Sequence, residues 1–77
     1  MPSIVRCRSP NSVDRMIGAR VRYARQARQL SRAELAARLG IPPGRLVLYE
    51  LGARRVSAEM LFQLATVLDV RLGTFFR

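Results

Sequence analysis

Arginine supplies most of the ionisable side chains in this sequence, and its characteristic chemistry is the binding of phosphate. The 77 residues include 14 arginines, no lysine and no histidine, against five acidic residues, so the formal net charge is +9 at pH 7. The planar guanidinium group can bond two phosphate oxygens at once. Such a charge on a chain of this size favours a polyanionic partner, DNA or RNA before an anionic membrane. A basic surface without a function is the alternative.

The side chains that catalysis and metal binding require are scarce. Without histidine there is no nucleophile–base pair, and five carboxyl groups are few for sharing the roles of acid and base. We therefore expect no enzyme activity, no cofactor and no metal site. The single thiol, Cys7, excludes an internal disulfide and is typical of a reducing compartment. We interpret it as incidental, the alternative being a redox sensor flanked by Arg6 and Arg8.

The elements that position these arginines are predicted to be helices. Residues 1–12 contain Pro, Ser and Asn with little periodicity, which predicts a flexible basic arm. Residues 13–77 are predicted to form one all-α domain of five short helices, because apolar residues recur at helical spacing and no strand alternation is present. The first helix is expected to begin between Ser12 and Asp14 and to bury Ile17 and Val21. No apolar run is long enough for a membrane span, and no signal-peptide core is present.

Two short helices joined by a glycine turn occupy the centre of this domain. Ser31 and Glu34 have the spacing of a capping box at the start of the first, and Gly40 ends it by permitting a left-handed backbone. The second runs from residue 42 or 43 to residue 51, because proline is tolerated in a first turn, and Gly52 ends it. This layout predicts a helix-turn-helix, which reads DNA by placing its second helix in the major groove.

Several motifs keep their relative spacing along nearly the whole domain. They are Ile17-Gly18-x-Arg20-Val21-Arg22-x-x-Arg25, Leu30-Ser31-x-x-Glu34-Leu35-Ala36, Tyr49-Glu50-x-Gly52 and Val56-Ser57…Leu64-Ala65…Leu68…Val70…Phe76. Over residues 13–77 the sequence resembles the Cro/cI-type (xenobiotic-response-element, lambda-repressor-like) helix-turn-helix family. The resemblance implies a compact five-helix domain that binds double-stranded operator DNA as a homodimer and regulates transcription, with repression favoured. A cytoplasmic, nucleoid-associated location goes with that function.

The resemblance also implies roles for individual charged residues. Arg25 and Glu50 match a family salt bridge between the first helix and the recognition helix. Arg32 starts the first helix of the helix-turn-helix, where the family often has a glutamine touching DNA, and its place at a helix amino end favours a phosphate contact. Arg54 and Arg55 match a loop in which family members grip the DNA backbone. Solvated surface charges are the alternative for these three.

The base-reading positions depart from the polar residues that the family usually carries. Those implied to contact DNA here are Pro43, Gly44, Arg45, Val47 and Leu48. Only Arg45 can make a bidentate contact with a base edge. The apolar positions could touch thymine methyl groups, but such contacts discriminate poorly. Two alternatives to specific DNA binding therefore remain open: a protein–protein interface on this apolar helix, and nucleic-acid binding of low specificity driven by the arginines.

The C-terminal segment holds more large apolar residues than a small core needs. Leu72, Phe75 and Phe76 are therefore expected to form the dimer surface. The alternative is that one or both aromatic rings close the core.

Overall fold

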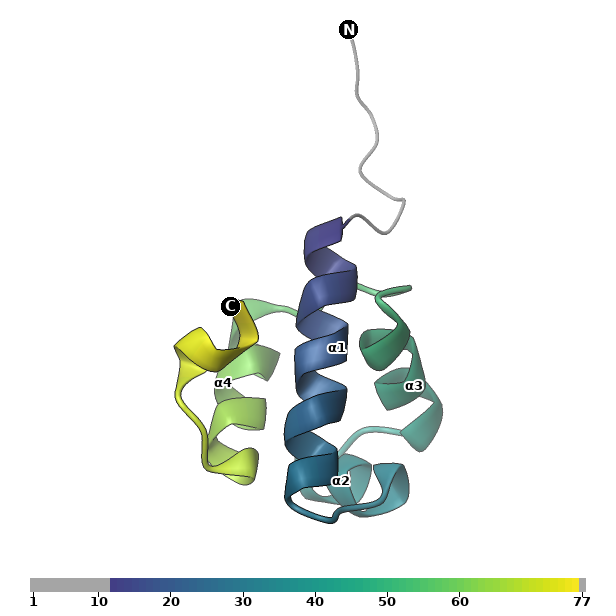
Figure 1. Cartoon of the computed structure of the whole chain (residues 1–77). Helices are drawn as coiled ribbons and strands as arrows, with labels where there is room; N and C mark the ends of the chain where they lie inside the picture. Colours follow the sequence, from purple (N-terminus) through teal and green to yellow (C-terminus); the bar gives the residue numbers. More distant parts are fainter. Residues whose placement is uncertain (1–11, 77) are drawn as a thin grey trace, which may run out of the picture.

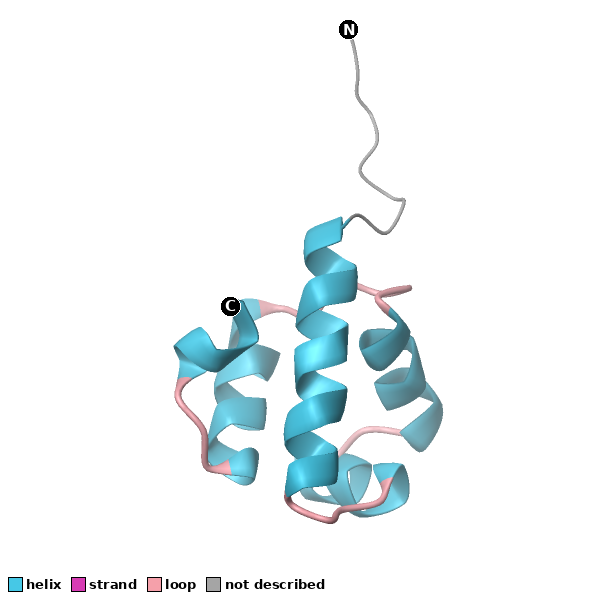
Figure 2. Ribbon diagram, viewed as in Figure 1, coloured by secondary structure: helices cyan, strands magenta, loops and turns pink. Residues whose placement is uncertain are grey.

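The computed structural model describes residues 12–76, which form four α-helices and a C-terminal 3-10 helix, with no strand in that range (Figures 1 and 2). The elements are α1 (Ser12–Ala27), α2 (Arg32–Leu39), α3 (Pro43–Leu51), α4 (Ala58–Leu68) and η1 (Leu72–Phe76). The all-α class is as expected. The fifth expected helix is a 3-10 helix, so the count of α-helices is four. Cys7 and the expected arm, except for Ser12, lie outside the described residues.

Local capping sets the bounds of α2 and α4. The Ser31 hydroxyl accepts a hydrogen bond from the Glu34 backbone N–H at 3.0 Å, and the Ser31 N–H donates to the Glu34 carboxylate at 2.8 Å. These reciprocal bonds confirm the predicted capping box. Gly40 ends α2 in the left-handed region, with φ of 72°. At the start of α4, Ser57 accepts from the Met60 N–H at 3.1 Å.

The core is built around α1, which lies between α3 on one side and α4 with η1 on the other, while α2 packs against α3 and α4 (Figure 1). The largest fully buried side chains come from every element: Val21, Leu35, Leu46, Leu64, Leu68 and Phe75. Phe75 has no exposed surface, so the expectation that it contributes to a dimer surface is wrong for this fold: the ring closes the core.

Glycine permits an unusually close crossing of α1 and α3. A Cβ atom at Gly18 would lie 2.6 Å from the backbone oxygen of Glu50 and closer still to that of Tyr49. Any side chain there would press against backbone atoms, which cannot rotate away as a flexible side chain can. The crossing brings the last turn of α3 against the middle of α1, and this contact positions the charged site described next.

Candidate nucleic-acid interface

A buried carboxylate joins the recognition helix to the rest of the domain. The Glu50 side chain, in the last turn of α3, is only 2% exposed. Arg25 Nε donates to Glu50 Oε2 at 2.7 Å, and Arg25 Nη2 donates to Oε1 at 3.3 Å. The third nitrogen, Arg25 Nη1, donates to the backbone oxygen of Leu30 at 2.8 Å. Arg25 and Glu50 are thus a bidentate pair between α1 and α3, in the positions that the family resemblance implies.

Arg32 shares the same carboxylate. It is the first residue of α2, and its Nε donates to Glu50 Oε1 at 2.9 Å. The Arg32 side chain remains 43% exposed, whereas that of Arg25 is 8% exposed. Sequence reasoning missed this contact, because Arg32 and Glu50 are 18 positions apart and nothing in their local patterns connects them. Arg32 is therefore more than a solvated surface charge, because its side chain forms an ion pair within the domain.

The loop between α3 and α4 is tied to the start of α1. Asp14 is buried in the first turn of α1, and Arg55 Nε lies 3.4 Å from its Oδ1. Arg55 keeps 65% of its side chain exposed. Its neighbour Arg54 is also exposed, and the structure gives it no ion pair within residues 12–76. The two loop arginines, treated alike by the sequence, thus differ in their local partners.

The predicted reading positions lie on an outward part of α3. Leu46 and Tyr49 point into the core, with 0% and 6% exposure. The residues at the first turn are exposed: Pro43, Gly44 and Arg45. Further along, Val47 is half-buried, while Leu48 is 40% exposed and Leu51 is 64% exposed. The outward surface of α3 therefore combines one guanidinium group with aliphatic side chains.

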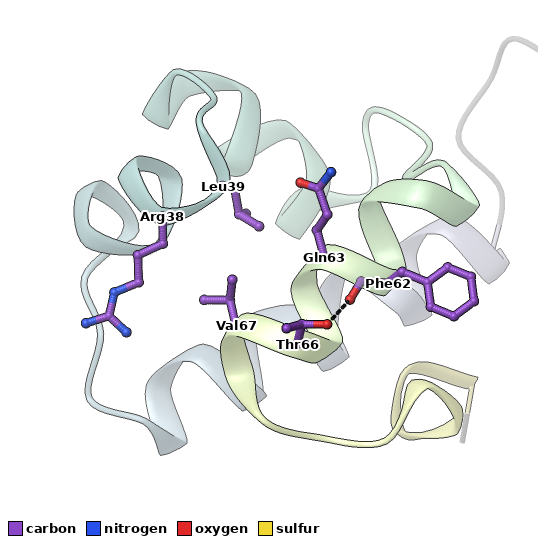
Figure 3. A pocket seen from close by; sticks show the side chains of 6 residues that line it. All are labelled: Arg38, Leu39, Phe62, Gln63, Thr66 and Val67. Atoms are coloured by element: carbon purple, nitrogen blue, oxygen red, sulfur yellow. Dashed lines mark hydrogen bonds between the residues drawn. The ribbon is translucent and has the colours of Figure 1, made fainter.

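A shallow groove runs between α2 and α4 (Figure 3). Its volume is about 330 Å³, and its lining consists of Arg38, Leu39, Phe62, Gln63, Thr66 and Val67. The Thr66 hydroxyl donates to the Phe62 backbone oxygen at 2.9 Å, so it is engaged within α4. One ionisable group lines the groove, and one such group provides no acid–base pair for catalysis.

Neither a metal-binding cluster nor a membrane-spanning helix is found in the part of the chain that the structure describes. No group of three or more His, Cys, Asp or Glu side chains there is arranged to hold a metal ion. None of the helices in residues 12–76 combines the length and the apolar character that a membrane crossing requires.

Comparison with known proteins gives relatives that are described as transcriptional regulators. A transcriptional regulator in the ATPase CF(0) region of Rhodospirillum rubrum is 38% identical over 69 residues, which are 90% of this chain and 64% of that protein. An HTH-type transcriptional regulator of Sinorhizobium fredii is 35% identical over 69 residues, covering 90% of this chain and 48% of the relative. The chain thus spans about half to two thirds of the length of these curated relatives.

Two crystal structures share the fold. The restriction-modification controller protein C.AhdI from Aeromonas hydrophila matches with a TM-score of 0.80 and 32% identity, over 86% of this chain and 100% of that one. The clp gene regulator ClgR from C. glutamicum matches with a TM-score of 0.81 and 26% identity, over 86% of each chain. The model of the helix-turn-helix family matches residues 21–75. These residues run from the middle of α1 through the α2–turn–α3 unit to η1, and the chain accordingly belongs to the Cro/cI-type helix-turn-helix family.

Proposed function

We propose that this chain is a DNA-binding transcriptional regulator that places α3 in the major groove, with repression as its favoured mode of action. The observation that carries the proposal is that Arg45 is exposed in the first turn of α3. The inner side of the same helix is fixed to α1 by the bond between Glu50 and Arg25. Residues 13–77 would form the DNA-binding domain, with η1 as the counterpart of a fifth helix and residues 1–12 as a basic arm. Relatives described as transcriptional regulators support this assignment.

The distribution of acidic groups supports a polyanionic ligand. Four of the five acids have a partner within the domain: Asp14 with Arg55, Glu34 in its capping box, Glu50 with two arginines and Asp69 with Arg28 at 3.6 Å. These contacts leave a large excess of guanidinium groups facing solvent, and such an excess attracts phosphate-rich polymers. No role as an enzyme, no cofactor and no metal enters the proposal.

The residues divide into base-reading and backbone-contacting groups. Arg45 would bond to a guanine edge in the major groove, and Pro43, Val47 and Leu48 would contact thymine methyl groups. Arg32, Arg54 and Arg55 would contact phosphates and set the register of the domain on the duplex. In a two-fold homodimer the two recognition helices would lie about 34 Å apart, one turn of the duplex.

A second function is favoured by one specific observation. Leu48 and Leu51 expose 40% and 64% of their surface on the same short helix, and clustered apolar surface is typical of protein interfaces. In this alternative, α3 binds a protein and the arginines contribute only nucleic-acid binding of low specificity.

Fluorescence anisotropy over a salt series tests the proposal. The probes are a duplex selected for binding from a randomised pool and a scrambled duplex of the same composition. We expect Arg45→Ala to lose about 1–3 kcal/mol of preference for the selected duplex, whereas Arg54→Ala weakens binding to both duplexes and reduces the salt slope by about one. Arg71→Ala is the matched control, because Arg71 is an exposed arginine in the segment between α4 and η1, outside the helix-turn-helix and the α3–α4 loop.

Two results would count against DNA binding by α3. A folded protein that binds neither duplex at low salt overturns the DNA function. Equal binding to both duplexes, unchanged by Arg45→Ala, rejects sequence reading and leaves only the electrostatic interaction.

A further inference from the structure

The Glu50 carboxylate accepts hydrogen bonds from two guanidinium groups at once. Oε2 accepts from Arg25 Nε at 2.7 Å, while Oε1 accepts from Arg25 Nη2 at 3.3 Å and from Arg32 Nε at 2.9 Å. One negative charge meets two positive charges, so the cluster keeps an excess of one positive charge. This excess lies where α2 begins, because Arg32 is the first residue of that helix.

Arg25 alone already satisfies the buried acid. Its bidentate contact uses both Glu50 oxygens, and its remaining nitrogen bonds to the Leu30 backbone oxygen. All three nitrogens of the buried arginine are thus engaged inside the domain. The contact from Arg32 is an addition to a pair that is complete without it, which suggests a role beyond satisfying the buried charge.

Arg32 is bound at one nitrogen and open at the others. Its Nε is the atom that bonds to Glu50, and within residues 12–76 the structure gives no partner for its two terminal amino groups. The side chain is 43% exposed, so these groups can reach a ligand from solvent. A planar group fixed at Nε has few orientations left, and its terminal N–H groups then face a restricted direction.

The start of α2 is also electropositive for a second reason. The backbone N–H groups of a first helical turn carry partial positive charge. Binding of an anion beside them is therefore favourable, and a cation there is unfavourable unless a negative group lies close to it. Glu34 balances part of it by bonding to the Ser31 N–H. The terminal amino groups of Arg32 add positive charge beside this turn, so the local chemistry suits an anionic oxygen such as that of a phosphodiester.

We propose that Glu50 is a positioning residue for DNA binding: it holds Arg32 by Nε so that the terminal amino groups of Arg32 are presented, already ordered, to one phosphate of the DNA backbone beside α2. This inference rests on the proposed function and deepens it. The same carboxylate that fixes α3 against α1 would then also set the phosphate contact made by α2. Holding the side chain in advance spares the ordering cost that a freely rotating arginine meets on binding.

The proposal distinguishes arginine from lysine at position 32. Arginine spreads its donors over three nitrogens, so one can bond to the carboxylate while the others bond to phosphate. The lysine ammonium concentrates its donors on one atom, and a contact with the buried Glu50 carboxylate draws that atom away from the phosphate. A simple charge effect would treat the two side chains alike.

The test compares Arg32→Lys and Arg32→Ala with the unchanged protein, using anisotropy on the selected duplex across a salt series. We expect both variants to weaken binding about tenfold, which matches the loss of one charge-assisted hydrogen bond. Arg32→Ala should also lower the salt slope by about one. Arg71→Lys is the control and should bind like the unchanged protein. Thermal unfolding of each variant checks that the fold persists, since Arg25 still satisfies Glu50.

Glu50→Gln supplies a second readout where that variant folds. Its effect on DNA affinity should largely disappear in an Arg32→Ala background, because Glu50 is inferred to act through Arg32. Binding of Arg32→Lys equal to that of the unchanged protein, in affinity and in salt slope, would overturn the inference and leave the proposed function intact. Failure of the unchanged protein to bind any duplex would instead overturn the proposed function itself.

Discussion

Two buried acids, Glu50 and Asp14, show how individual residues tie separate elements together. Glu50 joins α3 to α1 through Arg25 and to α2 through Arg32. Asp14 joins the first turn of α1 to the loop between α3 and α4 through Arg55. A buried carboxylate is costly to desolvate, so each requires a partner in the folded state. Each acid pairs with an arginine that is proposed to contact DNA, Glu50 with Arg32 and Asp14 with Arg55. The residues that stabilise the domain are thus neighbours of those proposed to bind phosphate.

At the same scale, Glu34 predicts an acid-dependent loss of stability. The hydrogen bond from the Ser31 backbone N–H, followed by the bond with the Ser31 side chain, lowers the pKa of Glu34 below its ordinary value. A group with a lowered pKa in the folded state stabilises the protein above its unfolded pKa, about 4.3 for Glu, and loses that contribution as the pH falls through the folded pKa. We expect the unfolding midpoint of the unchanged protein to exceed that of Glu34→Gln at pH 7, and the difference to shrink on acidification.

Thermal unfolding monitored by circular dichroism between pH 7 and pH 3 measures this difference. Glu59→Gln is the control, because it removes the same charge from the first turn of α4 without breaking a hydrogen bond in the structure. A gap between Glu34→Gln and the unchanged protein that stays constant across the pH range would contradict the prediction.

Among the elements, the crossing of α1 and α3 determines where the charged cluster forms. Gly18 allows the backbone of α3 to approach α1, and Arg25 lies two turns further along α1, where it reaches Glu50. Wider separation of the two helices would lengthen both bonds to the carboxylate. The geometry of the site therefore depends on a residue that contacts no ligand.

Gly18→Ala and Gly44→Ala are expected to change stability in opposite directions. Alanine is the better helix former, so Gly44→Ala should stabilise by about 0.5–1 kcal/mol, because its Cβ would meet nothing within 4 Å. At Gly18 the added Cβ meets the backbone oxygens of Tyr49 and Glu50, and the overpacking should outweigh the propensity gain, for a net loss of about 1–2 kcal/mol. Urea unfolding measures both changes. Equal stabilisation by the two substitutions would contradict the prediction, because it would show that α3 moves away from α1 at little cost in free energy.

On the scale of the whole molecule, neighbouring aromatic residues have opposite surroundings. Phe75 is fully buried, whereas Phe76 is 51% exposed and Leu72, in the same 3-10 helix, is half-buried. We propose that any homodimer surface at this end of the chain uses Phe76 and Leu72, without Phe75. Phe62, on α4, is similarly exposed at 60% and lines the groove between α2 and α4.

Substitution of the aromatic residues separates core from surface. Phe76→Ser should weaken self-association at least about tenfold, since it removes a large apolar side chain from the proposed interface. Phe75→Ala should instead lower the free energy of unfolding by about 3–5 kcal/mol, because it leaves a cavity. Sedimentation over a concentration series and urea unfolding give the two quantities. Phe62→Ser is the matched surface control; weaker association in this variant, with Phe76→Ser unchanged, would move the interface to the groove.

Local patterns in the sequence were sufficient to predict the helices and their caps. The capping box at Ser31 and the glycine ends at Gly40 and Gly52 each depend on atoms within a few positions of one another, so short-range spacing identifies them. The apolar stripe of α1 likewise follows from helical periodicity. Family resemblance identified the Arg25 and Glu50 pair. The 3-10 geometry of η1 does not follow from the sequence, because five residues are too few for a periodic signal.

The sequence by itself determined the helical class, the excess of guanidinium groups and the placement of the helix-turn-helix. Only the tertiary structure decided that Arg32 shares Glu50 with Arg25, that Arg55 pairs with Asp14, and that Phe75 is buried while Phe76 is exposed. The physical reason is the distance along the chain between the residues that interact. Capping and periodicity act between residues near one another in the chain, whereas the partner of a buried charge and the burial of a ring depend on how α1, α2 and α3 cross in space.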